Sequence, residues 1–243
     1  MLRHTGERRS FTHNLRLAIL LSLNAGFINA AGFIAFAVLT TNVTGHAALL
    51  AVDMATGQFR AARMVAVWLL LFLAGAFASS LYIGKVGRDK SFAYTVPIMV
   101  IFLLVLVIAA FGSNYRHTLP ETEYFAGSLL FAMGMQNALV SLVSGSTVRT
   151  THLTGLVTDL GIDLSGVLLS RKQPNPTLKR RILLRIAIIG FFLLGGLAGG
   201  WAFLTFQFAA FYLPAGLMLS VLFYDYLRVG VRRVMRRRQR PHQ

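Results

Sequence analysis

The sequence predicts an all-α protein that crosses a membrane several times and consists of two repeated halves. Hydrophobic residues make up 56% of the 243 residues and charged residues only 13%, which is more apolar than the surface of a water-soluble protein tolerates. Apolar runs recur along the whole chain, which favours several spans over one anchor. The third observation is a pair of matching polar stretches, "TTNVTGHAALLAVD" from Thr40 to Asp53 and "TTHLTGLVTDLGID" from Thr150 to Asp163.

Eight apolar segments are each bounded by charge, proline or a polar cluster. They cover residues 17–39, 43–56, 64–84, 93–111, 124–143, 153–169, 182–204 and 206–226. The first run is longer than the apolar region of a cleaved export signal, so we expect it to remain as the first span. No stretch resembles a soluble domain. We therefore expect one integral membrane domain over residues 1–243, with basic tails at 1–16 and 228–243.

Three separated blocks of sequence repeat at an offset of about 110 residues. The block "GFINA", from Gly26 to Ala30, precedes the first T-T-x-x-T-G motif, and "GMQNA", from Gly134 to Ala138, precedes the second. In both halves an aspartate follows the glycine of the motif by eight positions. Agreement in three blocks predicts repeat halves at 17–111 and 124–226.

The same blocks resemble a known family. The pattern N-A … T-T-x-x-T-G … D in the first half, with "GMQNALV" and "VRTTHLTGLVTDL" in the second, is similar to the YoaK-type bacterial integral membrane proteins, a family of unknown function. The resemblance covers nearly the whole chain, and "VRTTHLTG" is its most specific part. It implies a polytopic protein of the bacterial cytoplasmic membrane and supplies no substrate or reaction. One departure is His46, where such proteins often carry asparagine.

Two of the eight segments are poor membrane spans. The segment 43–56 is too short to cross easily, and 153–169 contains two aspartates. Paired short segments at matching positions of two halves indicate the binding site of a transporter. Their length favours six full spans plus two short or re-entrant helices, which makes the halves inverted. The alternative is eight spans with parallel halves. The distribution of Lys and Arg fits both, and both place the two termini in the cytoplasm.

The acids of the two short segments should avoid lipid, because an aspartate at the centre of a span costs roughly 2.5 to 3.5 kcal/mol on insertion scales. We expect both segments to face a shared polar seam, with asparagines from neighbouring spans. Threonines before each motif glycine should cap the short helices and direct their positive ends inward. The candidate substrate-binding or ion-binding residues are Asp53, Asp159, Asp163, Thr44, Gly45, Thr154, Gly155, Asn29, Asn137 and His152.

Structural roles compete with binding at these positions. Intramembrane asparagines such as Asn29 and Asn137 often serve helix packing, and Asp53 has Arg60 and Arg63 nearby as partners for a static ion pair. The interleaved G-x-x-x-G patterns of residues 195–200 predict close helix contact, inside the bundle in preference to a dimer. A homo-oligomer formed through these glycines is the alternative.

Missing motifs, the lack of cysteine and the net charge exclude several classes of function. Metalloprotease and serine hydrolase motifs are absent, and a chain without cysteine excludes thiolate chemistry and disulfides. We expect no enzyme, cofactor or metal. The net charge is +16, but the basic blocks at 171–185 and 228–240 flank apolar runs, which favours anionic lipid head groups over nucleic acid as the partner. We predict a small-solute transporter or channel. The alternative is a non-transporting membrane module that binds a protein partner or a lipid head group.

Overall fold

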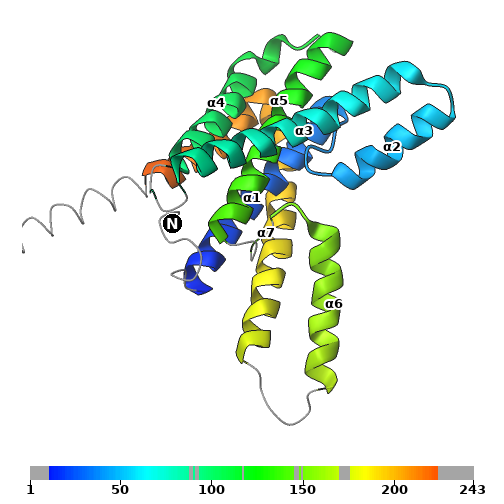
Figure 1. Ribbon diagram of the computed structural model, residues 1–243. Helices are drawn as coiled ribbons and strands as arrows, with labels where there is room; N and C mark the ends of the chain where they lie inside the picture. The colour runs from blue at the N-terminus through cyan, green and yellow to red at the C-terminus, as the bar shows by residue number, and fades with distance from the viewer. Residues whose placement is uncertain are drawn as a thin grey trace, which may run out of the picture.

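In the described residues each apolar segment predicted from the sequence is largely helical (Figure 1), and residues 224–226 of the last segment lie outside them. The computed structural model describes residues 11–87, 90, 93–116, 118–144, 148, 150–169 and 176–223. In this part of the chain the elements are α1 (Phe11–Phe36), α2 (Val43–Ala55), α3 (Phe59–Val86), α4 (Thr95–Phe111), the 3-10 helix η2 (Gly112–Asn114), α5 (Leu119–Ser144), α6 (Leu153–Leu169), α7 (Pro176–Phe206) and the 3-10 helix η3 (Gln207–Phe211). A last helical stretch runs over residues 212–223. The all-α prediction is confirmed.

Five helical stretches are long and apolar enough to cross a membrane. They are Phe11–Phe36, Phe59–Val86, Thr95–Asn114, Pro120–Ser144 and Pro176–Phe223. The short helix α2 is apolar but has only 13 residues, and α6 is not among the five. Large apolar side chains are exposed on the outer faces, such as Phe77 at 65% and Leu197 at 73%. An apolar exterior of this extent fits a surface in contact with lipid.

Helices α1 and α7 lie along each other and run in the same direction. A Cβ on Gly195 would collide with the backbone of Leu23, and a Cβ on Gly199 would collide with the backbone of Phe27. Because both residue numbers rise together along the contact, the helices are parallel. The small residues of α7 therefore allow the two backbones to touch, and the predicted glycine contact lies inside the bundle.

Helices α3 and α5 form a second parallel pair. Arg63 contacts Glu123 at 3.8 Å near the starts of the two helices, and a Cβ on Gly134, further along α5, would collide with the carbonyl of Phe72. A Cβ on Gly75 would in turn collide with α5. The α3–α5 contact is thus also a close approach of two backbones.

The two pairs join where α1 crosses α5 in the opposite direction. Asn24 is hydrogen-bonded to Gln136, and a Cβ on Gly32 would lie 3.2 Å from Leu129, so residue numbers rise along one helix and fall along the other. Helices α1 and α7 therefore run one way, and α3 and α5 the other. The short helices fold back as hairpins, α2 on α3 and α6 on α7, and the hairpins extend from the crossing in different directions (Figure 1).

Corresponding positions make corresponding contacts in the two pairs. Gly26 and Gly134 hold the same place in "GFINA" and "GMQNA". Gly26 closely approaches the backbone carbonyl of Phe192 in α7, and Gly134 closely approaches the backbone carbonyl of Phe72 in α3. Three residues after these phenylalanines, each partner helix has a glycine, Gly195 in α7 and Gly75 in α3. A Cβ on Gly195 would collide with the backbone of α1, and a Cβ on Gly75 would collide with the backbone of α5. The contact of α1 with α7 therefore recurs between α5 and α3.

Candidate functional site

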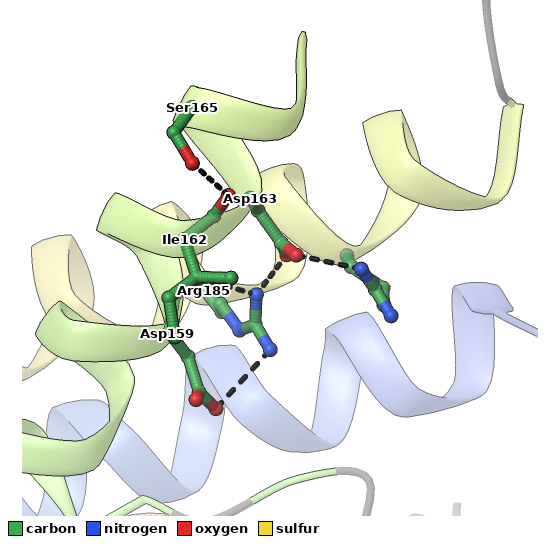
Figure 2. Close-up of polar contacts among 6 residues, drawn as sticks. Asp159, Ile162, Asp163, Ser165 and Arg185 are labelled. Carbon is green, nitrogen blue, oxygen red and sulfur yellow. Dashed lines mark hydrogen bonds and ion pairs between the residues drawn. The ribbon is translucent and has the colours of Figure 1, made fainter. Parts of the chain in front are cut away.

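The strongest electrostatic feature of the described residues is an ion cluster that ties α6 to α7 (Figure 2). Asp163 is buried, and its carboxylate accepts hydrogen bonds from Arg181 at 2.6 Å and from Arg185. Arg185 also donates to the carboxylate of Asp159 at 3.1 Å and to its backbone carbonyl at 2.9 Å. Two acids four residues apart meet two arginines four residues apart, because both pairs lie on single helix faces. The four charges cancel.

The ion cluster determines whether the carboxylate of Asp163 is free to bind a ligand. Its carboxylate is occupied by two guanidinium groups, so in this arrangement it holds the hairpin together. Static pairing, which the sequence suggested for Asp53, occurs at Asp163 instead. Among the described residues the Asp53 carboxylate has no ion pair, since Arg63 pairs with Glu123. In the same ranges no group of three His, Asp or Glu side chains stands where it could hold a metal ion.

The structure does not bring Asp53 and Asp163 together. Asp53 lies in α2 and Asp163 in α6, which belong to separate hairpins (Figure 1). The cause is the direction of the helices that precede them. Because α1 and α5 cross antiparallel, the segments that follow their ends leave the crossing at opposite ends.

The segment between α1 and α2 is anchored by Asn29. Its side-chain oxygen accepts hydrogen bonds from the backbone N–H of Thr41 at 3.1 Å and from the hydroxyl of Thr41 at 3.0 Å. The neighbouring Thr40 is fully buried, and its hydroxyl has no hydrogen-bond partner. Asn29 therefore holds the polar turn against the helix that precedes it.

Helix α2 is capped by an asparagine that the sequence analysis did not select. Asn42 accepts a hydrogen bond from the N–H of Gly45 at 3.0 Å and directly precedes the first helical residue. The prediction that threonine caps this helix is wrong, because Thr44 is already inside its first turn. Asparagine is among the preferred N-cap residues. Thr44 is exposed.

The second turn resembles the first in part. Thr150 is fully buried, and its hydroxyl has no partner, as at Thr40. His152 directly precedes α6, and its Nδ1 would lie 3.1 Å from a Cβ on Gly155. The His152 side chain thus lies next to Gly155 as the Asn42 side chain lies next to Gly45, the glycine of the first motif. Thr154 is exposed, like its counterpart in α2.

Asn137 occupies the position of Asn29 in the second block but differs in its bonding. Its side-chain oxygen is buried and makes no hydrogen bond. Thr151, the counterpart of Thr41, makes no bond to it. The second turn therefore lacks the anchor that the first turn has.

Sequence reasoning missed the amide pair at the crossing of α1 and α5. The Nδ2 of Asn24 donates to the Oε1 of Gln136 at 2.7 Å, and the Nε2 of Gln136 donates to the carbonyl of Leu21 at 3.0 Å. Both side chains are 1% exposed, and the Oδ1 of Asn24 has no partner. The available signal was Gln136 itself, a polar residue inside the repeated block "GMQNA".

His46, the departure from the family pattern, lies where α2 packs on α3. Its side chain is buried, with the ring centroid 5.6 Å from that of Trp68. The Nδ1 of His46 and the Nε1 of Trp68 are both buried and have no partner. The contact joins the short helix to the long one through aromatic packing.

The chain is similar to a known membrane protein. A transmembrane protein, "UPF0700 transmembrane protein YoaK" of Bacillus subtilis (strain 168), is 26% identical to the chain over 174 residues, which cover 71% of this chain and 77% of that protein. No solved structure matches the chain. The family model described as "Protein of unknown function (DUF1275)" matches residues 17–224. The chain is thus a multi-pass membrane protein, and it belongs to the DUF1275 family.

Proposed function

We propose that the protein is a transporter or channel for a small solute, built from two inverted repeats. The observation that carries the proposal is the direction of the four long helices. The pair α1 and α7 runs opposite to the pair α5 and α3, and the glycine contacts match position by position. A two-fold axis that exchanges the pairs must lie across the helices, hence in the plane of the membrane. Inverted repeats of this kind are typical of secondary transporters, with the site between the repeats.

The helix directions also favour six crossings. Helices α1 and α3 run in opposite directions, so α2 between them adds no net crossing, and the same holds for α6 between α5 and α7. With α4 and the helical stretch that begins at residue 212, the chain would cross six times. This agrees with the inverted arrangement and not with eight spans in parallel halves.

Charge supports an orientation with the N-terminus in the cytoplasm. Because α1 and α7 are parallel, their N-terminal ends lie on one side of the membrane, and Arg16, Lys179 and Arg180 are exposed near these ends. Exposed cations at these helix ends are what the positive-inside rule expects of a cytoplasmic face. We infer that these cations bind anionic lipid head groups of the bacterial cytoplasmic membrane.

The buried polar groups favour a neutral solute. Among the described residues, the buried polar side chains other than His46 and Asp163 are amides and hydroxyls, namely Ser22, Asn24, Thr40, Ser79, Gln136, Ser144 and Thr150. None is charged, and the charge of Asp163 is cancelled by its arginines. The free side-chain oxygen of Asn24 at the crossing can accept a hydrogen bond from a solute. We therefore place the solute path at the α1–α5 crossing and assign the protein no catalysis.

Cysteine accessibility tests the proposal without knowledge of the solute, because the natural chain has no cysteine. A single Gln136→Cys variant in membrane vesicles should react with a small water-soluble methanethiosulfonate, since a solute path contains water. The matched control is Val105→Cys, which is fully buried and belongs to α4 and not to either of the crossing helices, and it should stay unmodified. If Gln136→Cys is as unreactive as the control, the crossing is dry and the non-transporting alternative holds.

A further inference from the structure

The two polar turns contain corresponding residues in different states. Asn29 and Asn137 are both the fourth residue of their blocks, and Thr41 and Thr151 are both the second residue of their motifs. Asn29 binds the N–H and the hydroxyl of Thr41. The oxygen of Asn137 is buried without any partner. We call the pair Thr40–Thr41, which Asn29 anchors, the closed turn, and the pair Thr150–Thr151, which Asn137 does not anchor, the released turn.

The released turn retains what it needs to close. A buried carbonyl oxygen without a hydrogen bond is unfavourable, which favours any arrangement that supplies a donor. Thr151 offers the same two donors that Thr41 uses in the first turn. Thr40 and Thr150 are equally buried, so the two pairs share this feature and differ in the anchor on the threonine that follows.

We propose that the two anchors alternate. In the second state Asn137 holds Thr151, while Asn29 releases Thr41. The amide pair at the crossing lies between the two turns, because Asn29 follows Asn24 along α1 and Asn137 follows Gln136 along the antiparallel α5. Closing one turn and releasing the other then changes the end at which the crossing is accessible. Inverted repeats achieve alternating access by exchanging conformations in this way.

This inference rests on the proposed function, and hydrogen exchange of the full chain in lipid nanodiscs tests it separately. In the wild type the N–H groups around Thr41 should exchange more slowly than those around Thr151. Asn29→Ala should speed exchange at Thr41 about tenfold, the effect of losing one typical hydrogen bond, and slow exchange at Thr151. Asn137→Ala should slow exchange at Thr41 further, although Asn137 touches nothing there. The control Thr205→Ala removes a hydroxyl that bonds only within its own helix, and it should change neither turn.

The reciprocal effect decides the outcome. If Asn137→Ala leaves exchange around Thr41 unchanged, the turns are independent and the inference is refuted. Should an asparagine variant fail to fold, Thr41→Val and Thr151→Val weaken the same two anchors and carry the same reciprocal expectation. If the two asparagine variants change hydrogen exchange reciprocally but Gln136→Cys stays unreactive, the alternation of the anchors is supported and the proposed transport is refuted. If Gln136→Cys reacts but exchange is not reciprocal, the proposed transport is supported and the alternation is refuted.

Discussion

Arg185 binds the carboxylate of Asp163 across the α6–α7 hairpin, and the two side chains are 17% and 3% exposed. Removing Asp163 leaves the largely buried guanidinium of Arg185 with only the exposed Asp159 as a partner, and breaking a buried pair typically costs about 3 to 5 kcal/mol. Asp163→Asn should therefore lower the midpoint of thermal unfolding in detergent strongly. Asp159→Asn should lower it far less, because Asp159 is 53% exposed and exposed pairs contribute about 0 to 1 kcal/mol.

A double-mutant cycle of Asp163→Asn with Arg185→Met isolates this contact. We expect the double variant to be more stable than the sum of the single losses predicts, because the two charges that lose their partners, Arg181 and Asp159, are more than half exposed to solvent. Additive losses would mean that the two residues act separately.

The matched glycine contacts predict matched effects of alanine. In both Gly26→Ala and Gly134→Ala the added methyl group would collide with a backbone carbonyl of the partner helix, and overpacking typically costs about 1 to 3 kcal/mol. Both variants should unfold at lower temperature. Gly190→Ala is the control, because nothing lies within 4 Å of its Cβ, and it should be neutral or slightly stabilising. A loss at Gly26 without one at Gly134 would contradict the equivalence of the two pairs.

Local features of the fold could be predicted from the sequence because they depend on apolar length and on nearby residues. The segment 153–169 matches α6 at both ends, and 43–56 differs from α2 by one residue. Helices α3, α5 and α7 extend beyond their predicted apolar runs at both ends, whereas α4 is two residues shorter than its run. Helix α7 begins at Pro176, six residues before the predicted Ile182, because the basic stretch between them is helical as well.

The contacts of the candidate site could not be predicted in the same way. Pairing of Asp163 with Arg185 depends on how α6 folds back on α7, and a spacing in sequence does not specify that register. The predicted meeting of Asp53 with Asp163 assumed that matching segments converge, whereas antiparallel α1 and α5 send them to opposite ends. The cap of α2 is the exception. Asn42 stands directly before the helix, so capping preference alone would have identified it.

The amide pair gives a test that separates packing from binding. Gln136→Leu leaves Asn24 buried without its partner, which should cost about 1 to 3 kcal/mol. Replacing both residues by leucine removes the unpartnered groups, so Asn24→Leu with Gln136→Leu should recover much of the loss in thermal unfolding. If the double variant is no more stable than Gln136→Leu alone, the pair does not act as a unit.

The proposed inverted arrangement makes a definite prediction for the two sides of the membrane. Gln58 precedes α3 and is exposed, and Lys90 follows α3 and is exposed. With six crossings and a cytoplasmic N-terminus, a membrane-impermeant maleimide should label Gln58→Cys in whole cells, while Lys90→Cys should react only after the cells are opened. With eight crossings the two results would be exchanged, because α2 would then cross the membrane completely. Thr12→Cys, at the start of α1 and exposed, is protected in whole cells in both arrangements. It therefore reports whether the cells are sealed, and the contrast between Gln58 and Lys90 decides between inverted and parallel halves.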